Sequence, residues 1–361
     1  MSEALLSRRR MLSIGSGLTI VGGSGCLRLQ GGESSGGENS ALLERQVETV
    51  KNIDGNLLIG TGSGLYRLPI GQPNQFEQIG EYPIGSILEI RHGVYMLDFS
   101  NLVRWTEESY NRISQFRPIK TKLQYQDGLV FGSAGTLYRM TDEENPTVEW
   151  RKSVNAGDFY EIFGVTDSII LMRIQSEGVF GYSLTNGDEI FGPLSPSDVG
   201  TSAAQVGDSF IYGNTGFQLE GSTASTISVS EEWTGDESGI NRSVVANSDA
   251  IFISNSTGAI FRISPSFEQD WQSSINREPT GSNSAVANGM LYIGGENPLG
   301  IVALDTTTGD QVWQSDVSAA EIRSVYAIPE VGCIVEKMND DEQRSIAAFG
   351  ETAGTKQWEL P

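Results

Sequence analysis

Cysteine and histidine are nearly absent from the 361-residue sequence, which contains two cysteines, Cys26 and Cys333, and a single histidine, His92. Two cysteines cannot build a disulfide framework, and without a C-x-x-C pair they do not match a zinc site. A lone histidine has no partner for nucleophilic catalysis, since neither a G-x-S-x-G nor an H-E-x-x-H motif occurs. We therefore predict neither catalytic residues nor a metal site. His92 is interpreted as a turn residue and Cys333 as a small buried hydrophobic residue.

Lysine is scarce as well. Only six of the 24 basic residues are lysine, against 46 acidic residues, and the formal net charge is −22. A chain with this charge repels polyanions, so nucleic acid is not an expected partner. An acidic, lysine-poor composition favours a halophilic origin, in which salt screens the repulsion, over an ordinary acidic secreted protein. Paired acids such as Glu143-Glu144 are expected to be solvated surface rather than calcium ligands.

Long runs of helix-forming residues are lacking, while glycine supplies 43 residues, about 12% against roughly 7% in average proteins. From residue 40 onward, apolar runs of strand length recur 35 to 42 residues apart, with centres at Leu58, Tyr95, Val130, Ile170, Ile211, Phe252, Tyr292 and Ile334. Periods near 40 with about four strands per unit are typical of propeller blades. We therefore predict an all-β, eight-bladed β-propeller of four-stranded antiparallel blades over residues 40–361. Seven blades is the alternative, because Glu44–Val50 could begin the first blade or complete the last.

The clearest unit is Asn288–Val317, where two short strands and a tight turn precede a tryptophan. The pattern A-x-D-x-x-T-G-x-x-x-W is complete in this unit and recurs more loosely near the C-terminus. It resembles the tryptophan-docking motif of the pyrroloquinoline-quinone-type (PQQ-like) repeat family, whose eight-bladed propellers include quinoprotein dehydrogenases and a non-catalytic lipoprotein of outer-membrane assembly. The resemblance implies a blade-docking role, with each indole buried between adjacent blades, for Ala303, Asp305, Gly309, Trp313, Gly354 and Trp358.

The same resemblance is the only indication of a cofactor. Quinone-dependent members of the family carry a calcium-binding set and adjacent cysteines, and this sequence has no adjacent cysteines and no assignable calcium ligands. We therefore predict that no cofactor is bound, and pyrroloquinoline quinone is considered through the family resemblance alone.

Residues 1–25 are predicted to be a twin-arginine signal peptide. Arg8 and Arg9 precede a mildly apolar run rich in Gly and Ser, and its weak hydrophobicity favours the twin-arginine export route. The run ends in a sequence that resembles a lipobox, so Cys26 is the predicted lipidation site; an incidental cysteine is the alternative. Residues 26–39 are rich in Gly and Ser and are predicted to be a flexible tether.

These features predict a lipid-anchored protein at the outer face of the cytoplasmic membrane. By analogy with the assembly lipoprotein, its propeller is expected to be a non-catalytic scaffold for a protein or glycan partner. A quinoprotein dehydrogenase or another enzyme with a site in the central funnel is the alternative. Two N-x-[ST] sequons make Asn241 and Asn255 candidate glycosylation sites.

Overall fold

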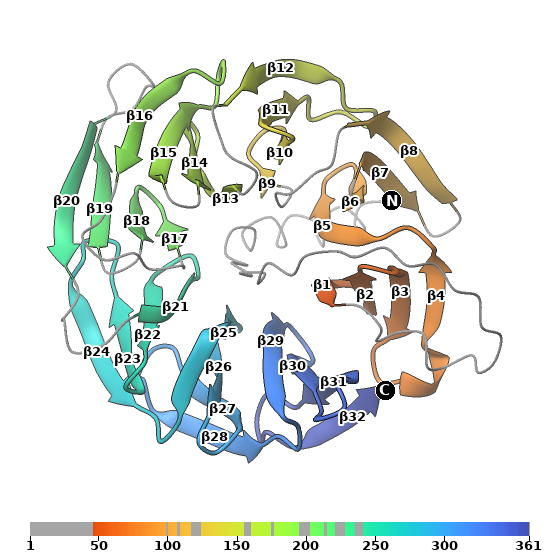
Figure 1. The fold of residues 1–361 in the computed structure, drawn as a ribbon, viewed down its shortest axis with the longest axis vertical. Coiled ribbons are helices and arrows are strands. Elements are labelled where there is room, and N and C mark those ends of the chain that lie inside the picture. Colours follow the sequence, from red (N-terminus) through yellow and green to blue (C-terminus); the bar gives the residue numbers. More distant parts are fainter. Residues whose placement is uncertain are drawn as a thin grey trace, which may run out of the picture.

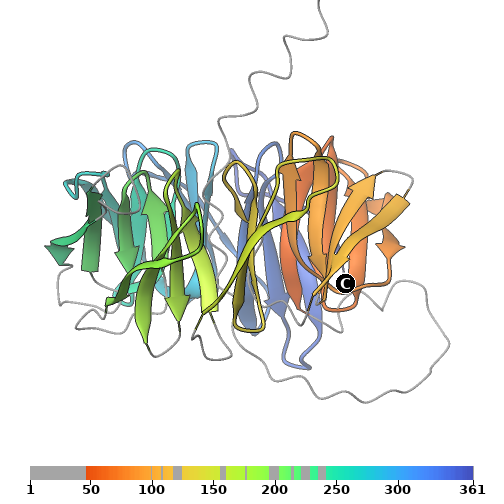
Figure 2. The same ribbon diagram turned by 90° about the horizontal axis from the view of Figure 1, so that it is seen from above.

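The computed structural model describes residues 46–360, except for 99, 107–108, 117–123, 155–159, 175–176, 195–202, 213–214, 221–227 and 235–240. The described strands form eight antiparallel sheets of four strands each, arranged as blades around a ring (Figure 1). Viewed edge-on, the ring is a disc whose strands run between its two faces (Figure 2). The prediction of an eight-bladed propeller is confirmed, and the seven-bladed alternative is wrong.

Each blade takes its four strands from one continuous stretch of chain. Blade 1 consists of β1 (Val47–Ile53), β2 (Asn56–Thr61), β3 (Gly64–Pro69) and β4 (Glu77–Gly80). Blade 2 consists of β5 (Ile84–Ile90), β6 (Gly93–Asp98), β7 (Asn101–Thr106) and β8 (Ser109–Gln115). Blade 3 consists of β9 (Gln124–Tyr125), β10 (Leu129–Ser133), β11 (Thr136–Met140) and β12 (Val148–Ser153). Blade 4 consists of β13 (Tyr160–Val165), β14 (Ile169–Ile174), β15 (Gly178–Ser183) and β16 (Glu189–Leu194).

The second half of the ring repeats this order. Blade 5 consists of β17 (Ala203–Val206), β18 (Ser209–Tyr212), β19 (Thr215–Glu220) and β20 (Ser228–Thr234). Blade 6 consists of β21 (Asn241–Ala246), β22 (Ile251–Asn255), β23 (Ala259–Ile263) and β24 (Gln269–Ser274). Blade 7 consists of β25 (Glu278–Ala287), β26 (Met290–Glu296), β27 (Gly300–Asp305) and β28 (Gln311–Asp316). Blade 8 consists of β29 (Glu321–Ile328), β30 (Gly332–Met338), β31 (Arg344–Phe349) and β32 (Lys356–Leu360).

Within each blade the chain runs from the centre of the ring to its rim, as Figure 1 shows. The strand that could have belonged to either end of the ring is β1, which pairs with β2 and so begins blade 1. Among the described residues, no strand of blade 1 therefore completes blade 8. The ring closes by packing of β1 against β29.

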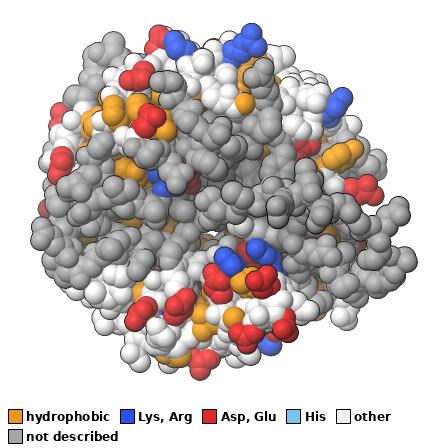
Figure 3. Space-filling view, in the orientation of Figure 1, with side chains coloured by type: hydrophobic (Ala, Val, Ile, Leu, Met, Phe, Trp, Pro, Cys, Tyr) orange, Lys and Arg blue, Asp and Glu red, His pale blue; other side chains and the backbone are white. Residues whose placement is uncertain are grey.

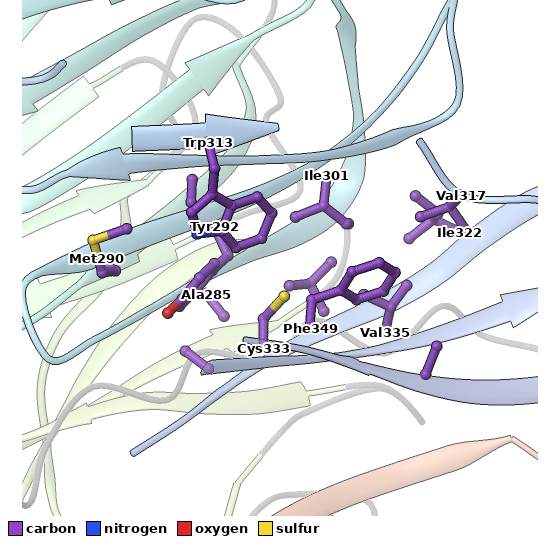
Figure 4. Close-up of a cluster of buried hydrophobic side chains, with 14 residues drawn as sticks. Ala285, Met290, Tyr292, Ile301, Trp313, Val317, Ile322, Cys333, Val335 and Phe349 are labelled. Carbon is purple, nitrogen blue, oxygen red and sulfur yellow. The ribbon is translucent and has the colours of Figure 1, made fainter. Parts of the chain in front are cut away.

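The hydrophobic core is divided into eight clusters, one at each interface between neighbouring blades. A four-stranded sheet cannot bury both of its faces alone, and stacking around the ring buries them between neighbours. At the interface of blades 7 and 8, Trp313 lies beside Tyr292, and Cys333 lies near Phe349 (Figure 4). The eight apolar centres predicted from the sequence all lie on the second strand of a blade.

Outside the strands, the described residues include a short 3-10 helix, η3 (Pro73–Gln75). No helix in the described part of the chain combines the length and the apolar character that a bilayer-spanning segment requires. On the face shown in Figure 3, acidic and basic side chains are interspersed over the described surface.

Candidate binding groove between blades 2 and 3

One position on the fourth strand carries an aromatic side chain in six of the eight blades. It follows a register shift in the fourth strand and pairs across to the third strand. The pairs are Trp150 with Arg139, Phe191 with Gly181, Trp233 with Gly216, Trp271 with Arg262, Trp313 with Ala303 and Trp358 with Ala348. We call this the docking position.

A tryptophan at the docking position reaches the turn between the third and fourth strands of the next blade. The indole N–H of Trp313 donates to the Glu351 carbonyl at 2.6 Å, and the ring lies against Gly354. Trp271 donates to the Thr306 carbonyl at 3.1 Å and lies against Gly309, and a Cβ on that glycine would come within 2.7 Å of the indole. Glycine is required at these turns because any side chain would meet the ring, and both glycines have positive φ.

The turn that receives Trp271 is built by the residues of the A-x-D-x-x-T-G motif. The side chain of Asp305 accepts hydrogen bonds from the N–H groups of Thr307 and Thr308 at 2.7 and 2.9 Å. This bonding within the turn holds the backbone so that Gly309 faces the neighbouring blade. Ala303 is fully buried in the cluster of blades 7 and 8, where its small side chain pairs opposite Trp313.

Trp358 differs from these tryptophans because its neighbour is blade 1. It is half-buried and packs on the cluster shared by blades 8 and 1. Among the described residues, its indole N–H has no hydrogen-bond acceptor of the kind that Trp313 has. Among the described residues, the interface between blades 8 and 1 therefore lacks the indole hydrogen bond that Trp271 and Trp313 make at their interfaces.

Blade 2 has no aromatic residue at the docking position. Asn111 stands opposite Arg104 at the equivalent place on the third strand, but the register shift in β8 comes after Asn111 instead of before it. The receiving turn of blade 3 is also different, because residues 141–147 read TDEENPT and contain no glycine. Blade 2 thus presents a short polar side chain to a turn that is not shaped for an indole.

Polar contacts replace the tryptophan at this seam. The Tyr95 hydroxyl donates to the carbonyls of Glu143 and Glu144, each at 3.1 Å. Arg104 pairs with the Glu144 carboxylate at 2.7 Å, and this hydrogen bond and the arginine charge lower the pKa of Glu144. Deeper in the seam the Tyr125 hydroxyl donates to Asp142 at 2.8 Å. Burial and this hydrogen bond raise the pKa of Tyr125 to about 12.

The rim side of the same seam is open. Two adjoining hollows of about 550 and 700 Å³ lie between β8 of blade 2 and β12 of blade 3, and Ser114 and Val148 line both of them. The smaller hollow is lined by Asn111 and by Asn145, Pro146 and Thr147 of the receiving turn. It therefore lies at the docking position, where other blades place an indole. We call the two hollows together the blade 2–3 groove.

The groove carries positive charge on a strongly acidic protein. Three arginines and one glutamate line it: Arg104, Arg112, Arg151 and Glu149. Glu149 is paired with Arg139 at 2.9 Å, and Arg104 is paired with Glu144. Arg112 and Arg151 are exposed and have no carboxylate partner among the described residues. Arg151 pairs with Tyr138 on the face of blade 3 that packs toward blade 2, whereas Arg112 pairs with Val103 on the face of blade 2 that packs toward blade 1.

Comparison with known proteins supports the fold. The family model described as "Outer membrane protein assembly factor BamB" matches residues 267–361, which hold the end of blade 6 and blades 7 and 8. No curated protein matches the sequence. Among solved structures, the computationally designed Ika8 protein is 12% identical, with a TM-score of 0.63, over 86% of this chain and 99% of its own.

Two natural proteins also align. Saccharomyces cerevisiae Sqt1 is 12% identical, with a TM-score of 0.56, over 90% of this chain and 100% of its own. BamB from Moraxella catarrhalis is 14% identical, with a TM-score of 0.40, over 76% of this chain and 75% of its own. The matches to Ika8 and Sqt1 indicate a shared fold. The family match covers about a quarter of the chain, so the assembly role in its description is not transferred here.

The sequence-predicted residues fall in different places. His92 lies in the turn between β5 and β6, where its Nε2 accepts a hydrogen bond from Arg91 at 2.9 Å. Asn255 ends β22 with 2% of its surface exposed, and its side-chain oxygen accepts hydrogen bonds from Thr257 and Ala259. Glycosylation there would require this turn to open. The side chain of Asn241, and Arg8, Arg9 and Cys26 of the predicted signal and anchor, lie outside the described residues.

A quinone cofactor does not fit the described residues. No group of three or more His, Cys, Asp or Glu side chains within them is arranged to hold a metal ion. Cys333 is fully buried between blades 7 and 8, and burial raises the pKa of its thiol. This cysteine therefore faces the core and not the centre of the ring. The groove, by contrast, was not predicted from the sequence, because no motif marks a missing tryptophan.

Proposed function

We propose that this protein is a non-catalytic scaffold that binds a protein partner at the cell surface. The observation that supports it best is the blade 2–3 groove, which lies between the outermost strands of two blades and carries Arg151, a cation with no carboxylate partner among the described residues. Rims and loops of a rigid propeller are suited to binding, because the ring fixes the positions of the side chains that it displays. A protein is favoured over a glycan, since open strand edges offer N–H and C=O groups to a peptide backbone.

The cellular location is part of the same proposal and rests on the sequence. Arg8 and Arg9 direct export, lipidated Cys26 anchors the chain, and residues 26–39 tether the propeller at the outer face of the cytoplasmic membrane. A single lipid chain gives only marginal membrane binding, so a stable anchor requires more than one acyl chain on the cysteine.

Detergent phase partitioning in the native host tests the anchor. The wild-type protein should enter the detergent phase, and Cys26→Ser should move it to the aqueous phase. Arg8→Lys with Arg9→Lys should leave the unprocessed precursor inside the cell. Partitioning that is unchanged in Cys26→Ser would refute the lipid anchor.

Crosslinking on intact cells, followed by mass spectrometry, tests the binding role. A scaffold should give a reproducible crosslinked protein of defined mass with the wild-type chain. A chain that yields no crosslinked protein under conditions where a known surface complex does would refute the scaffold function.

A further inference from the structure

The single histidine of the chain lies at the interface between blades 2 and 3, beside a carboxylate that has an unused oxygen. His92 occupies the turn between β5 and β6, and Asp142 belongs to the receiving turn of blade 3. The His92 Nε2 atom is 3.7 Å from Asp142 Oδ1, and the Asp142 side chain is 11% exposed. Oδ1 itself is buried and accepts no hydrogen bond from the described residues. Because a buried acceptor without a donor costs desolvation energy, a new donor at this oxygen would stabilise the fold.

His92 cannot supply that donor while its ring is neutral. Nε2 accepts a hydrogen bond from Arg91 Nε at 2.9 Å, and a ring nitrogen that accepts carries no proton, so the proton of the neutral ring is on Nδ1. Asp142 makes its side-chain contacts through its other oxygen. Oδ2 pairs with Arg91 at 2.5 Å and accepts a hydrogen bond from the Tyr125 hydroxyl at 2.8 Å. Oδ1 therefore stays open in the neutral state.

Protonation of the ring reverses the role of Nε2. Histidine ordinarily changes its charge between about pH 5 and 8, and the charged ring has an N–H on both nitrogens. Nε2 then no longer accepts from Arg91, and it can donate to Asp142 Oδ1 once the two atoms approach by roughly 1 Å. Neighbouring cations repel each other, and the Arg91 side chain, which is 59% exposed, is free to turn toward solvent.

The charges around His92 leave Asp142 as its partner. Arg104 donates to the His92 carbonyl at 2.7 Å and pairs with the Glu144 carboxylate at 2.7 Å, while Glu143 is exposed. Burial raises the pKa of both tyrosines of this interface, so they keep their protons between about pH 5 and 8. The charged and titratable groups that face this site are Arg91, Arg104, Tyr95, Tyr125, Asp127, Asp142, Glu143 and Glu144.

We propose that protonation of His92 pairs it with Asp142 and fastens the receiving turn of blade 3 to blade 2 at acid pH. The stabilising effect of the pair is present at low pH and is lost as the pH rises and the histidine loses its proton. Asn145 and Thr147 of the same turn line the smaller hollow of the blade 2–3 groove, so the switch acts on one wall of the groove. This inference goes beyond the scaffold function and does not depend on it.

Nitrogen NMR of the full-length protein tests the protonation states. The protein is labelled with 15N-histidine and purified without a polyhistidine tag, so both ring signals belong to His92. At about pH 8 Nδ1 should carry the proton and Nε2 should not, and at about pH 5 both nitrogens should be protonated. A neutral ring with its proton on Nε2 would show that Nε2 does not accept from Arg91, and it would overturn the proposal.

A double-mutant cycle with His92→Gln and Asp142→Asn tests the new pair. Urea denaturation gives the unfolding equilibrium constant of each variant, and the titration of distant groups cancels in the cycle. The coupling, expressed as a factor in that constant, should be at least about fivefold larger at about pH 5 than at about pH 8, because the charge-assisted hydrogen bond forms only at the lower pH. Aspartate is ordinarily ionised at both values. Coupling that is equal at the two pH values, or larger at the higher one, would reject the pair.

The same cycle in an Arg91→Gln background separates a direct pair from a bridged one. The increase toward acid pH should persist there, since the pair does not require Arg91. Its disappearance would mean that Arg91 carries the coupling, and the proposed pair would be wrong.

Arg262 and Asp270 of blade 6 are the matched control, an ion pair without histidine. In a cycle with Arg262→Gln and Asp270→Asn, the coupling should change by less than about twofold between the same pH values, because arginine and aspartate ordinarily keep their charges in that range. An increase toward acid pH as large as that of the His92 cycle would contradict the assignment to His92.

Discussion

Gly354 of blade 8 lies so close to Trp313 of blade 7 that a β-carbon on the glycine would overlap the six-membered ring of the indole. The same relationship joins Trp271 to Gly309 and Trp150 to Gly187. Each pair links two consecutive blades through one hydrogen bond and one ring contact. The same contact therefore joins several pairs of neighbouring blades. The loss of unfolding free energy when it is disrupted can be measured.

Gly354→Ala should destabilise the protein by about 2 to 5 kcal/mol. An alanine in the left-handed backbone conformation is strained by about 1 to 2 kcal/mol. Steric overlap of its Cβ with the packed indole adds about 1 to 3 kcal/mol. Gly207→Ala is the matched control, because φ is 55° at Gly207 and 59° at Gly354, and no atom lies near the position of its Cβ. Chemical denaturation measures both variants. Equal losses would show that Trp313 does not press on Gly354.

Trp313→Ala should cost about 3 to 5 kcal/mol, the usual range for a buried tryptophan. Trp358→Ala should cost about 1 to 3 kcal/mol, because the Trp358 side chain is only half-buried and its N–H has no acceptor among the described residues. The denaturation midpoints of the two variants, measured at one salt concentration, show which substitution destabilises the protein more. If Trp358→Ala is the more destabilising, the ring-closing seam depends on tryptophan more than the geometry indicates.

The eight blades could be predicted from the sequence because the second strand of each blade is the most uniformly apolar. It has a strand on either side within its sheet and a neighbouring blade on either face, so nearly every residue is buried. The first strands are harder to recognise. After a register shift they carry small or hydroxyl-bearing residues that are buried where the ring narrows: Thr49, Ser86, Gly164, Ser243, Ser284 and Ser324.

The groove could not be predicted in the same way. The sequence shows that the early units keep little of the tryptophan motif, but a missing residue does not say what fills its place. At the seam of blades 2 and 3, Tyr95 and Arg104 take over the coupling and leave the rim open. Residues from two units about 40 positions apart line the groove, and only the ring geometry brings them together.

Cys333 provides a probe of the seam between blades 7 and 8. Its side chain is fully buried and burial raises the pKa of the thiol, so the reactive thiolate is scarce at neutral pH. In a Cys26→Ser background, a thiol reagent such as Ellman's reagent should leave the native protein unlabelled and react with one thiol after denaturation. Complete labelling of the native protein within minutes would contradict the burial of Cys333.

Glu336 is the buried charge at the ring closure. Its side chain is fully buried, and Oε1 accepts a hydrogen bond from the Val47 N–H at 3.1 Å and from Arg344 at 2.7 Å. The Tyr326 hydroxyl donates to the Val47 carbonyl at 2.7 Å. Blade 8 therefore holds the first residue of β1 through both its N–H and its carbonyl. Among the described residues, blades 1 and 8 share no strand. These hydrogen bonds therefore help to hold the two blades together where the ring closes.

Glu336→Gln should change how stability depends on pH. Burial raises the pKa of Glu336 above its ordinary value of 4.5, against the opposing effects of the Val47 N–H and Arg344. The native state thus binds a proton more tightly than the unfolded state, and wild-type stability falls as pH rises from 4.5 through the folded pKa. Glutamine stays neutral at every pH. The free energy of unfolding of the variant should therefore rise relative to that of the wild type, by about 1.4 kcal/mol for each pH unit between the unfolded-state and folded-state pKa values of Glu336.

Urea denaturation at several pH values measures the difference between wild type and Glu336→Gln. Glu268→Gln is the control, since Glu268 is an exposed acid in the turn before β24 and lies outside the ring closure. Below pH 4.5 both Glu336 and its glutamine replacement are neutral, so the difference should level off there. If the glutamine variant instead loses stability relative to wild type as the pH rises, then the ion pair with Arg344 outweighs burial, and Glu336 closes the ring as a stabilising charge.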